Sequence, residues 1–177
     1  MFDSKSPETI GYHLFFEPEG KLKDELQATI NKLSEKFDGP IFTPHVTVLA
    51  RIEEESDEIV IMKTLELASK IKPLTLELGD IDGEDAYFRA LYIKVSNPEV
   101  ITKYHQVANQ IFEMKDVTPY LPHLSLFYGN ESLDIEDIAD EIALPKRASF
   151  VAEKIIVYKT PGRAENWELI AEISLTK

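Results

Sequence analysis

The chain contains no cysteine, and this absence limits both its chemistry and its stabilisation. Without cysteine the chain can form no disulfide, no thiolate metal site and no cysteine nucleophile. Long apolar runs are also missing, since no stretch approaches the roughly 20 residues needed to span a bilayer. Residues 1–11 lack the basic and then apolar order of a secretory signal. We therefore expect a cytoplasmic protein without membrane contact.

Basic residues are scarce as well. The 19 Lys and Arg residues stand against 32 Asp and Glu residues, which gives a formal charge of −13. A broad docking surface for long DNA or RNA needs clustered positive charge, so long nucleic acids are disfavoured as partners. A small anion remains compatible with this composition because a local group of hydrogen-bond donors can hold it, and charges beyond about 8 Å are screened.

Several catalytic motifs are absent from the sequence. It has no His-Glu-x-x-His pattern, no Gly-x-Ser-x-Gly elbow and no glycine-rich phosphate loop. We therefore expect neither a metal nor a cofactor. The 177 residues, 44% of them hydrophobic, are ordinary for a globular protein and predict a single monomeric domain over residues 1–177.

The hydrophobic periodicity describes two similar halves. The first half predicts strands at 11–17, 43–52 and 74–78 and helices at 21–37 and 56–71, followed by a turn at 79–85. The second predicts strands at 86–95, 121–128 and 149–158, helices at 98–111 and 133–142, and an added strand at 167–175. Sliding the chain by 78 residues superposes the two series.

This repeat predicts an α+β fold made of duplicated β-α-β-α-β units. We expect two lobes, at approximately 1–85 and 86–177, which can exchange strands. Their two mostly antiparallel sheets would surround a central groove, with the helices outside.

The repeated segments are residues 43–48 (TPHVTV) and residues 121–126 (LPHLSL). Side chains alternate along a strand, so His45 and Thr47 share one face, and His123 and Ser125 do the same. If a pseudo-twofold axis relates the halves, two imidazoles and two hydroxyls meet across the groove. The other histidines, His13 and His105, lack such a hydroxyl and indicate structural or surface roles.

Two imidazoles and two hydroxyls suit a tetrahedral phosphate. The hydroxyls can donate to its oxygens, while one neutral histidine takes a proton from water and one protonated histidine gives a proton to the leaving sugar oxygen. Such machinery needs no metal. A cyclic phosphate is the natural substrate, because its ring keeps the leaving oxygen in place.

The paired His-x-Thr and His-x-Ser motifs resemble the 2H phosphoesterase superfamily. Five stretches extend the resemblance to its cyclic phosphodiesterase branch: residues 43–50, 86–95, 118–129, 149–160 and 166–171. This likeness implies hydrolysis of ADP-ribose 1″,2″-cyclic phosphate, often with activity on nucleoside 2′,3′-cyclic phosphates. It also implies a phosphate contact by Tyr128, and aromatic lining of the nucleoside side of the groove by Phe88 and Trp167.

Four questions stay open at this stage. Strict alternation turns Tyr128 away from Ser125, so its role requires a bulge or twist after Leu126. An RNA-end enzyme of the 2′-5′ RNA ligase type shares both motifs, and its basic rim would come from Arg51, Arg89, Lys94 and Lys115. A non-catalytic module that binds nucleotide phosphates is the third interpretation. Histidine roles cannot be read from a symmetric pair, although analogy favours His123 as base and His45 as acid.

Overall fold

The computed structural model describes residues 7–115, 118–130, 133–139 and 148–176. The strands are β1 (Tyr12–Phe16), β2 (Val46–Ile52), β3 (Leu74–Asp82), β4 (Leu91–Val95), β5 (His123–Phe127), β6 (Ala148–Ala152), β7 (Lys154–Lys159) and β8 (Glu168–Ser174). The helices are α1 (Gly20–Phe37), α2 (Asp57–Lys70), α3 (Glu99–Ile111) and α4 (Ile135–Ala139), with 3-10 turns η1 (Tyr87–Arg89) and η2 (Ala164–Asn166). Within the described residues, no helix combines the length and apolar character needed to cross a membrane.

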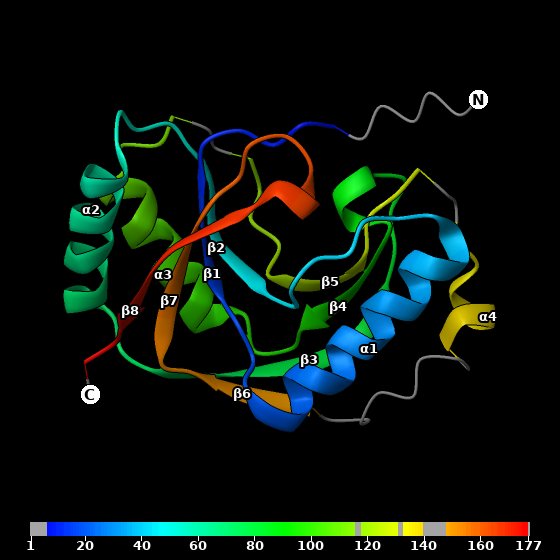
Figure 1. Cartoon of the computed structure of the whole chain (residues 1–177). Coiled ribbons are helices and arrows are strands. Elements are labelled where there is room, and N and C mark those ends of the chain that lie inside the picture. The colour runs from blue at the N-terminus through cyan, green and yellow to red at the C-terminus, as the bar shows by residue number, and fades with distance from the viewer. Residues whose placement is uncertain (1–6, 116–117, 131–132, 140–147, 177) are drawn as a thin grey trace.

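The eight strands form one antiparallel sheet in the order β6-β3-β4-β5-β2-β1-β7-β8 (Figure 1). Its two halves meet between β5 and β2, where Val46 opposite Leu124 is the only registered pair. The expected α+β class is confirmed, and the two expected sheets are the halves of one sheet. The α4 helix lies within the short helix predicted at 133–142, and residues 140–142 lie outside the described part of the chain.

The sheet order is symmetric under the 78-residue repeat. In the two halves β1 corresponds to β4, β2 to β5 and β3 to β7, and each pair occupies equivalent places about the centre of the sheet. However, β3 follows the first motif in sequence and pairs with β4, whereas β7 follows the second motif and pairs with β1. The half with β1 and β2 therefore contains β7 and β8 from the second repeat, and the half with β4 and β5 contains β3 from the first.

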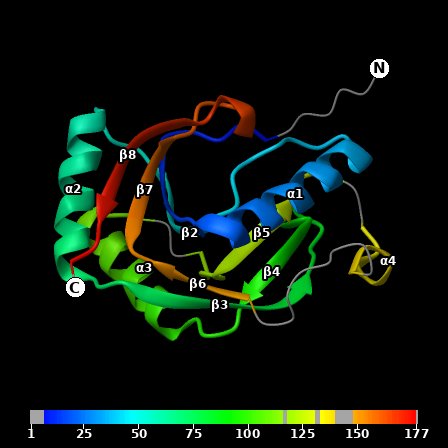
Figure 2. The same ribbon diagram turned by 60° about the horizontal axis from the view of Figure 1, so that its bottom comes forward.

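The sheet is strongly curled. Strands β6 and β7 are six places apart in the sheet order, which would be about 29 Å in a flat sheet at roughly 4.8 Å per strand. Only Glu153 separates them in the chain, so the Cα atoms of Ala152 and Lys154 are at most about 7 Å apart. The β6 edge must therefore bend towards β7, as Figure 2 illustrates.

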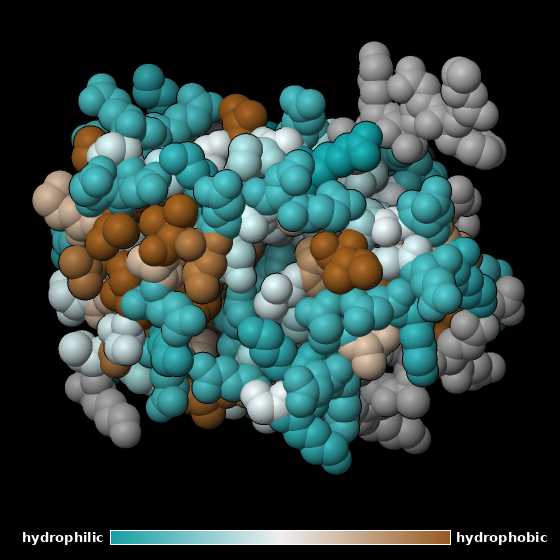
Figure 3. Space-filling model, viewed as in Figure 1, coloured by the Kyte–Doolittle hydropathy of each residue, from teal (hydrophilic) through white to brown (hydrophobic). Residues whose placement is uncertain are grey.

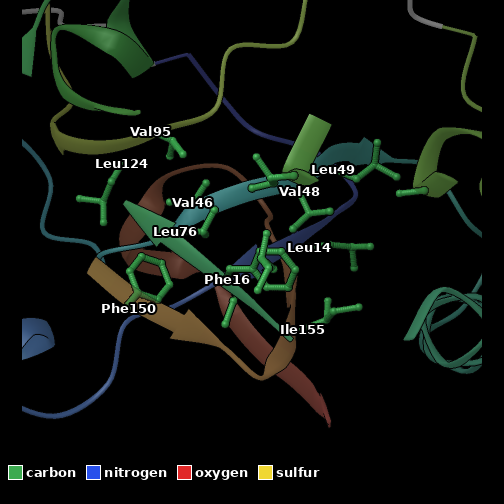
Figure 4. Close-up of a cluster of buried hydrophobic side chains, with 14 of the residues drawn as sticks. Leu14, Phe16, Val46, Val48, Leu49, Leu76, Val95, Leu124, Phe150 and Ile155 are labelled. Carbon is green, nitrogen blue, oxygen red and sulfur yellow. The ribbon is translucent and has the colours of Figure 1, made fainter. Parts of the chain in front are cut away.

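One face of this curled sheet carries the hydrophobic core. Val46, Val48, Leu124 and Leu126 are fully buried there, and Figure 4 shows part of the cluster that they share with Leu14 and other residues. Helix α1 packs against β5 and α3 packs against β2, so each helix covers a strand of the opposite repeat. Because alternate residues point away from this core, the intervening polar side chains face the other side of the sheet.

Three predicted boundaries were wrong. Strand β3 continues through residues 79–82, which were predicted as a turn, because Ile81 and Asp82 pair with β4 beyond a bulge. The predicted strand at 86–95 begins only at Leu91, since residues 87–89 form a 3-10 turn closed by the bond from Arg89 N to Ala86 O (2.9 Å). The strand predicted at 149–158 is two strands, β6 and β7, because the chain passes between the sheet halves at Glu153.

Some apolar side chains remain on the surface. Met62 and Leu65 of α2 and Leu169 of the edge strand β8 are all exposed. In the view of Figure 3, hydrophobic surface gathers over the region of β8. These side chains lie outside the polar face that carries the two histidine motifs.

Gly11 provides a test of the junction between β1 and β2. A Cβ at this position would stand 2.2 Å from Ile52 O, and the glycine has a φ of +77°. We expect Gly11→Ala to lower the unfolding free energy by more than about 2 kcal/mol, because backbone overlap adds to the roughly 1–2 kcal/mol cost of the left-handed conformation. Gly162→Ala is the matched control, since Gly162 has a φ of +68° and open space around it. Equal unfolding free energies for Gly11→Ala and Gly162→Ala, measured by denaturant unfolding, would contradict this account.

Candidate functional site

The two repeated motifs lie side by side at the centre of the sheet. His45 directly precedes β2 and His123 begins β5, so each lies one residue before a member of the Val46–Leu124 pair. Val46 and Leu124 point into the core, and the flanking residues therefore face the opposite side. His45 and Ser125 are buried there, whereas Thr47 and His123 are half-buried.

Each histidine is oriented by the same backbone contact. His45 Nδ1 lies 2.6 Å from Thr43 O, and His123 Nδ1 lies 2.7 Å from Leu121 O. A carbonyl oxygen can only accept, so each Nδ1 carries a hydrogen and donates it to the residue two positions earlier. This fixes the tautomer in both halves and leaves each Nε2 as the nitrogen free for proton transfer.

Burial makes both histidines hard to protonate in the free protein. The pKa of His45 is lowered to about 4, mainly by burial and also by the charge of His123, against the opposing effect of the Thr43 carbonyl. The pKa of His123 is also lowered, first by burial and then by the charge of Arg89, while the Leu121 carbonyl and Glu84 act in the opposite direction. An anion bound between the rings would counteract both shifts.

Tyr128 links the two motifs. Its hydroxyl, three residues after Ser125, lies 3.5 Å from His45 Nε2. The orientation arises from a bulge: Tyr92 pairs with Ser125 and the preceding Leu91 pairs with Phe127, so β5 carries the extra residue Leu126. The bulge that a phosphate contact by Tyr128 requires is therefore present, and burial raises the pKa of Tyr128, so its hydroxyl stays protonated.

The two predicted aromatic residues take different places. Phe88 lies on η1 rather than on a strand, where its ring meets Tyr128 edge-on with the centroids 5.2 Å apart, and its carbonyl accepts a bond from Ser125 Oγ (3.1 Å). Trp167 directly precedes β8, and its ring centroid is 6.0 Å from that of His45. The Trp167 indole N–H donates to Thr9 Oγ1 (2.9 Å), which fixes the ring beside the histidine.

A cavity of about 330 Å³ opens beside His45. It is lined by Phe15, Gln27, Asn31, Ile41, Phe42, Thr43, His45, Tyr158, Ala164, Glu165 and Trp167. Sequence reasoning selected only His45 and Trp167 from this set, and Phe88 is not among the lining residues. Phe15 stacks on His45 with the centroids 3.8 Å apart, and Phe42 stacks on Tyr128 at 3.9 Å. Alternation along β1 would have indicated Phe15, which shares a face with His13.

A polar group borders His123. Arg89 pairs with Glu84 at 2.8 Å, and the hydroxyl of Tyr92 donates to the same carboxylate at 3.1 Å. The ring of Tyr92 meets that of His123 edge-on, with the centroids 5.1 Å apart. Tyr92 therefore contacts the histidine of the second motif as Phe15 contacts the histidine of the first. The two geometries differ, because Tyr92 meets its histidine edge-on whereas Phe15 stacks on its own.

The two remaining histidines, His13 and His105, both make closer contacts with the fold than their sequence contexts suggested. His13 is buried against Phe15 and Trp167, and its Nε2 has no hydrogen-bond partner among the described residues. Burial lowers the pKa of His13 to about 3. His105 is half-buried, and its Nδ1 lies 2.8 Å from Val48 O, directly behind the first motif.

The buried His13 should make folding sensitive to acid. Its folded-state pKa lies below the unfolded value near 6.5, so the unfolded chain binds more protons and stability falls as the pH drops below 6.5 towards 3. Between pH 7 and pH 5, we expect the free energy of unfolding of His13→Phe to fall by about 2 kcal/mol less than that of the parent, as measured by urea unfolding. Tyr158→Phe, on the neighbouring strand, should keep the parental pH slope. Identical slopes for the parent and His13→Phe would refute the burial effect.

Comparisons with known proteins identify the family and support the fold. The family model described as "Cyclic phosphodiesterase-like protein" matches residues 10–175. The cyclic phosphodiesterase of Arabidopsis thaliana is 26% identical over 174 residues, which cover 93% of this chain and 94% of the plant protein. The crystal structures of E. coli LigT with 3′-AMP and with NADP+ superpose with a TM-score of 0.64, at 15% and 17% identity, over 96% and 97% of this chain and all of theirs. The chain therefore belongs to the cyclic phosphodiesterase-like family of phosphoesterases, within the 2H phosphoesterase superfamily.

Proposed function

We propose that this protein hydrolyses the cyclic phosphate of a small nucleotide to a phosphomonoester, without a metal ion. The substrate is a nucleoside 2′,3′-cyclic phosphate, ADP-ribose 1″,2″-cyclic phosphate, or both. One observation carries the proposal: the hydroxyl of Tyr128, three residues after Ser125 of the second motif, lies 3.5 Å from His45 Nε2 of the first. The two imidazole and hydroxyl pairs can therefore act on the same phosphate.

In the proposed reaction, Thr47, Ser125 and Tyr128 donate hydrogen bonds to the non-bridging phosphate oxygens. His123 Nε2 takes a proton from water as the water oxygen bonds to phosphorus. The bond from phosphorus to one sugar oxygen breaks, and His45 Nε2 gives that oxygen a proton. The ring opens, and the product keeps its phosphate as a monoester.

The position of the cavity supports the assignment of His45 as the acid. The leaving oxygen stays attached to the nucleoside, and the 330 Å³ cavity beside His45 offers aromatic walls, Trp167 among them, for that part of the substrate. The names of related proteins add support, since one is a cyclic phosphodiesterase and LigT was crystallised with nucleotides. His45 must be protonated to act, and the substrate's negative charge favours that state.

The ion pairs near the second motif favour a small nucleotide over an RNA end. Two of the four cations that could form a basic rim are already paired, Arg89 with Glu84 and Lys94 with Asp82. No Lys or Arg is among the described residues that line the cavity, and Glu165 adds a carboxylate there. A polyanionic RNA strand therefore meets little positive charge beside the site.

Turnover of 2′,3′-cyclic AMP in excess chelator is the direct test. We expect a phosphomonoester product, which can be followed by phosphorus NMR. Each proton transfer contributes about 10²- to 10⁴-fold in rate, so His45→Ala and His123→Ala should each lose at least about a hundredfold in kcat while melting like the parent. Tyr104→Phe, which removes a hydroxyl bonded to the backbone of Lys72 outside the groove, is the comparison for a general loss of fold. Binding without turnover would instead identify a binding module, and activity lost on chelation would contradict the metal-free reaction.

The hydroxyl residues should have a different signature. Thr47→Ala and Ser125→Ala remove donors to the phosphate but keep both histidines. We expect them to weaken substrate binding and lower kcat by about tenfold to a thousandfold, with the bell-shaped pH profile of kcat unchanged. A shifted profile would mean that these hydroxyls act through the histidines instead.

Anion binding should require proton uptake. Both site histidines have lowered pKa values in the free protein, and a bound anion raises them. Sulfate carries no titrating proton near neutral pH, so its affinity should rise by up to about tenfold for each pH unit from 7.5 down to 5.5, if one proton is taken up. Calorimetric titration measures this directly. His45→Ala should flatten the dependence, and a parental affinity independent of pH would oppose the proposed electrostatics.

A further inference from the structure

The central junction of the sheet is held together by side chains as well as by backbone pairing. Beyond the Val46–Leu124 pair, β2 and β5 share no further registered residues. The carbonyls of Thr47 and Val48 are instead bound by two side chains: the hydroxyl of Tyr120 donates to Thr47 O at 2.7 Å, and His105 Nδ1 lies 2.8 Å from Val48 O. Both contacts fall on the backbone of the first motif.

These two side chains form a single rigid unit. The rings of Tyr120 and His105 stack with their centroids 3.9 Å apart and an angle of 5° between planes. Asn109 Nδ2 lies 2.8 Å from His105 Nε2. The tautomer with its hydrogen on Nδ1 satisfies both contacts, since it donates to Val48 O and accepts from the amide of Asn109. We call Tyr120 and His105 the clamp.

The clamp stands where the other repeat has its ligand cavity. Under the 78-residue repeat, Tyr120 corresponds to Phe42, His105 to Gln27 and Asn109 to Asn31. Those three counterparts all line the cavity beside His45. The two ends of the junction have therefore diverged, because one end is open to a ligand and stacked aromatic rings fill the other.

The bulge in β2 explains why one stacked pair can reach two consecutive carbonyls. Phe15 pairs with Thr47 and Leu14 pairs with Leu49, so Val48 is an extra residue in β2. In a regular strand successive carbonyls point to opposite edges, and a bulge breaks that alternation. This arrangement leaves a flexible point directly beside Thr47 unless something else binds its backbone.

We propose that Tyr120 and His105 are positioning residues for the hydrolytic reaction. By binding the carbonyls of Thr47 and Val48, the clamp holds Thr47 and the adjoining His45 at a fixed separation from His123 and Ser125. Tyr120 is especially suited to this task, because it lies three residues before His123 and contacts the backbone of the opposite motif. The proposal rests on the function proposed above, and it concerns the geometry of that same site.

Two variants remove the hydrogen bonds of the clamp but keep its rings: Tyr120→Phe and His105→Phe. We expect kcat for 2′,3′-cyclic AMP to fall about tenfold to a hundredfold in each, since a displacement near 1 Å costs that much, while KM changes less than threefold. Tyr104→Phe is the matched control. Tyr104 lies on the same helix as His105. Its hydroxyl accepts a hydrogen bond from Lys72 N and donates one to Lys72 O, each at 3.1 Å. It should lower the melting temperature without reducing kcat.

A second measurement keeps this test independent of turnover. The chain has four histidines, so their ring nitrogen signals can be resolved by NMR in labelled protein. Tyr120→Phe should shift the His45 and His123 signals, both free and with sulfate, whereas Tyr104→Phe should leave them in place.

The two measurements separate the possible failures. If the parent turns over no cyclic nucleotide but the histidine signals shift in Tyr120→Phe, the proposed function fails and the clamp stands as a positioning device for the two rings. If the clamp variants lose thermal stability but retain both parental kcat and parental histidine signals, their role is structural only, and the clamp proposal is overturned.

Discussion

The pairing of Val46 with Leu124 is the constraint on which the rest of the site depends. Because these two residues face the core, their neighbours on either side must face away from it, and this brings both imidazoles and both hydroxyls to one surface. A longer ladder between β2 and β5 would occupy the backbone groups that Tyr120 and His105 now bind. The short pairing of β2 with β5 is therefore important in itself, because it leaves room for side chains at both ends of the contact.

The apolar surroundings of the histidines determine how the site meets an anion. Stacking on Phe15 and burial near Trp167 keep His45 neutral in the free protein. The protein as a whole carries a charge of −13, and cations near the second motif are paired with carboxylates. In the proposed function, phosphate recognition therefore relies on short-range donors and on a proton taken up from solvent, instead of long-range attraction.

Sequence patterns were sufficient where the governing rule is local. Alternation along a strand assigned His45 with Thr47 and His123 with Ser125 to common faces, and the 78-residue offset gave the correspondence of strands and helices. The conflict with strict alternation was also visible in the sequence: a role for Tyr128 required a bulge or twist after Leu126, and β5 contains a bulge at Leu126.

Other features depend on contacts between residues far apart in the chain, which periodicity does not report. The extension of β3 through the turn-like residues 79–82 results from pairing with β4, and the break at Glu153 results from a change of partner strands. His105 lacks a motif of its own, and its contact with Val48 follows only from the packing of α3 on β2. The cavity residues Gln27 and Asn31 come from a helix whose sequence shows only its apolar stripe.

The exchange of β3 and β7 between the halves has a consequence for synthesis on the ribosome. Strand β1 is among the first to leave the exit tunnel, yet its partner β7 lies at residues 154–159 and β8 follows still later. The early half must therefore wait with an open strand edge until nearly the whole chain has emerged, and such edges are prone to aggregation. A fragment that carries one repeat alone would lack a partner strand, because β1 pairs with β7 of the second repeat and β4 pairs with β3 of the first.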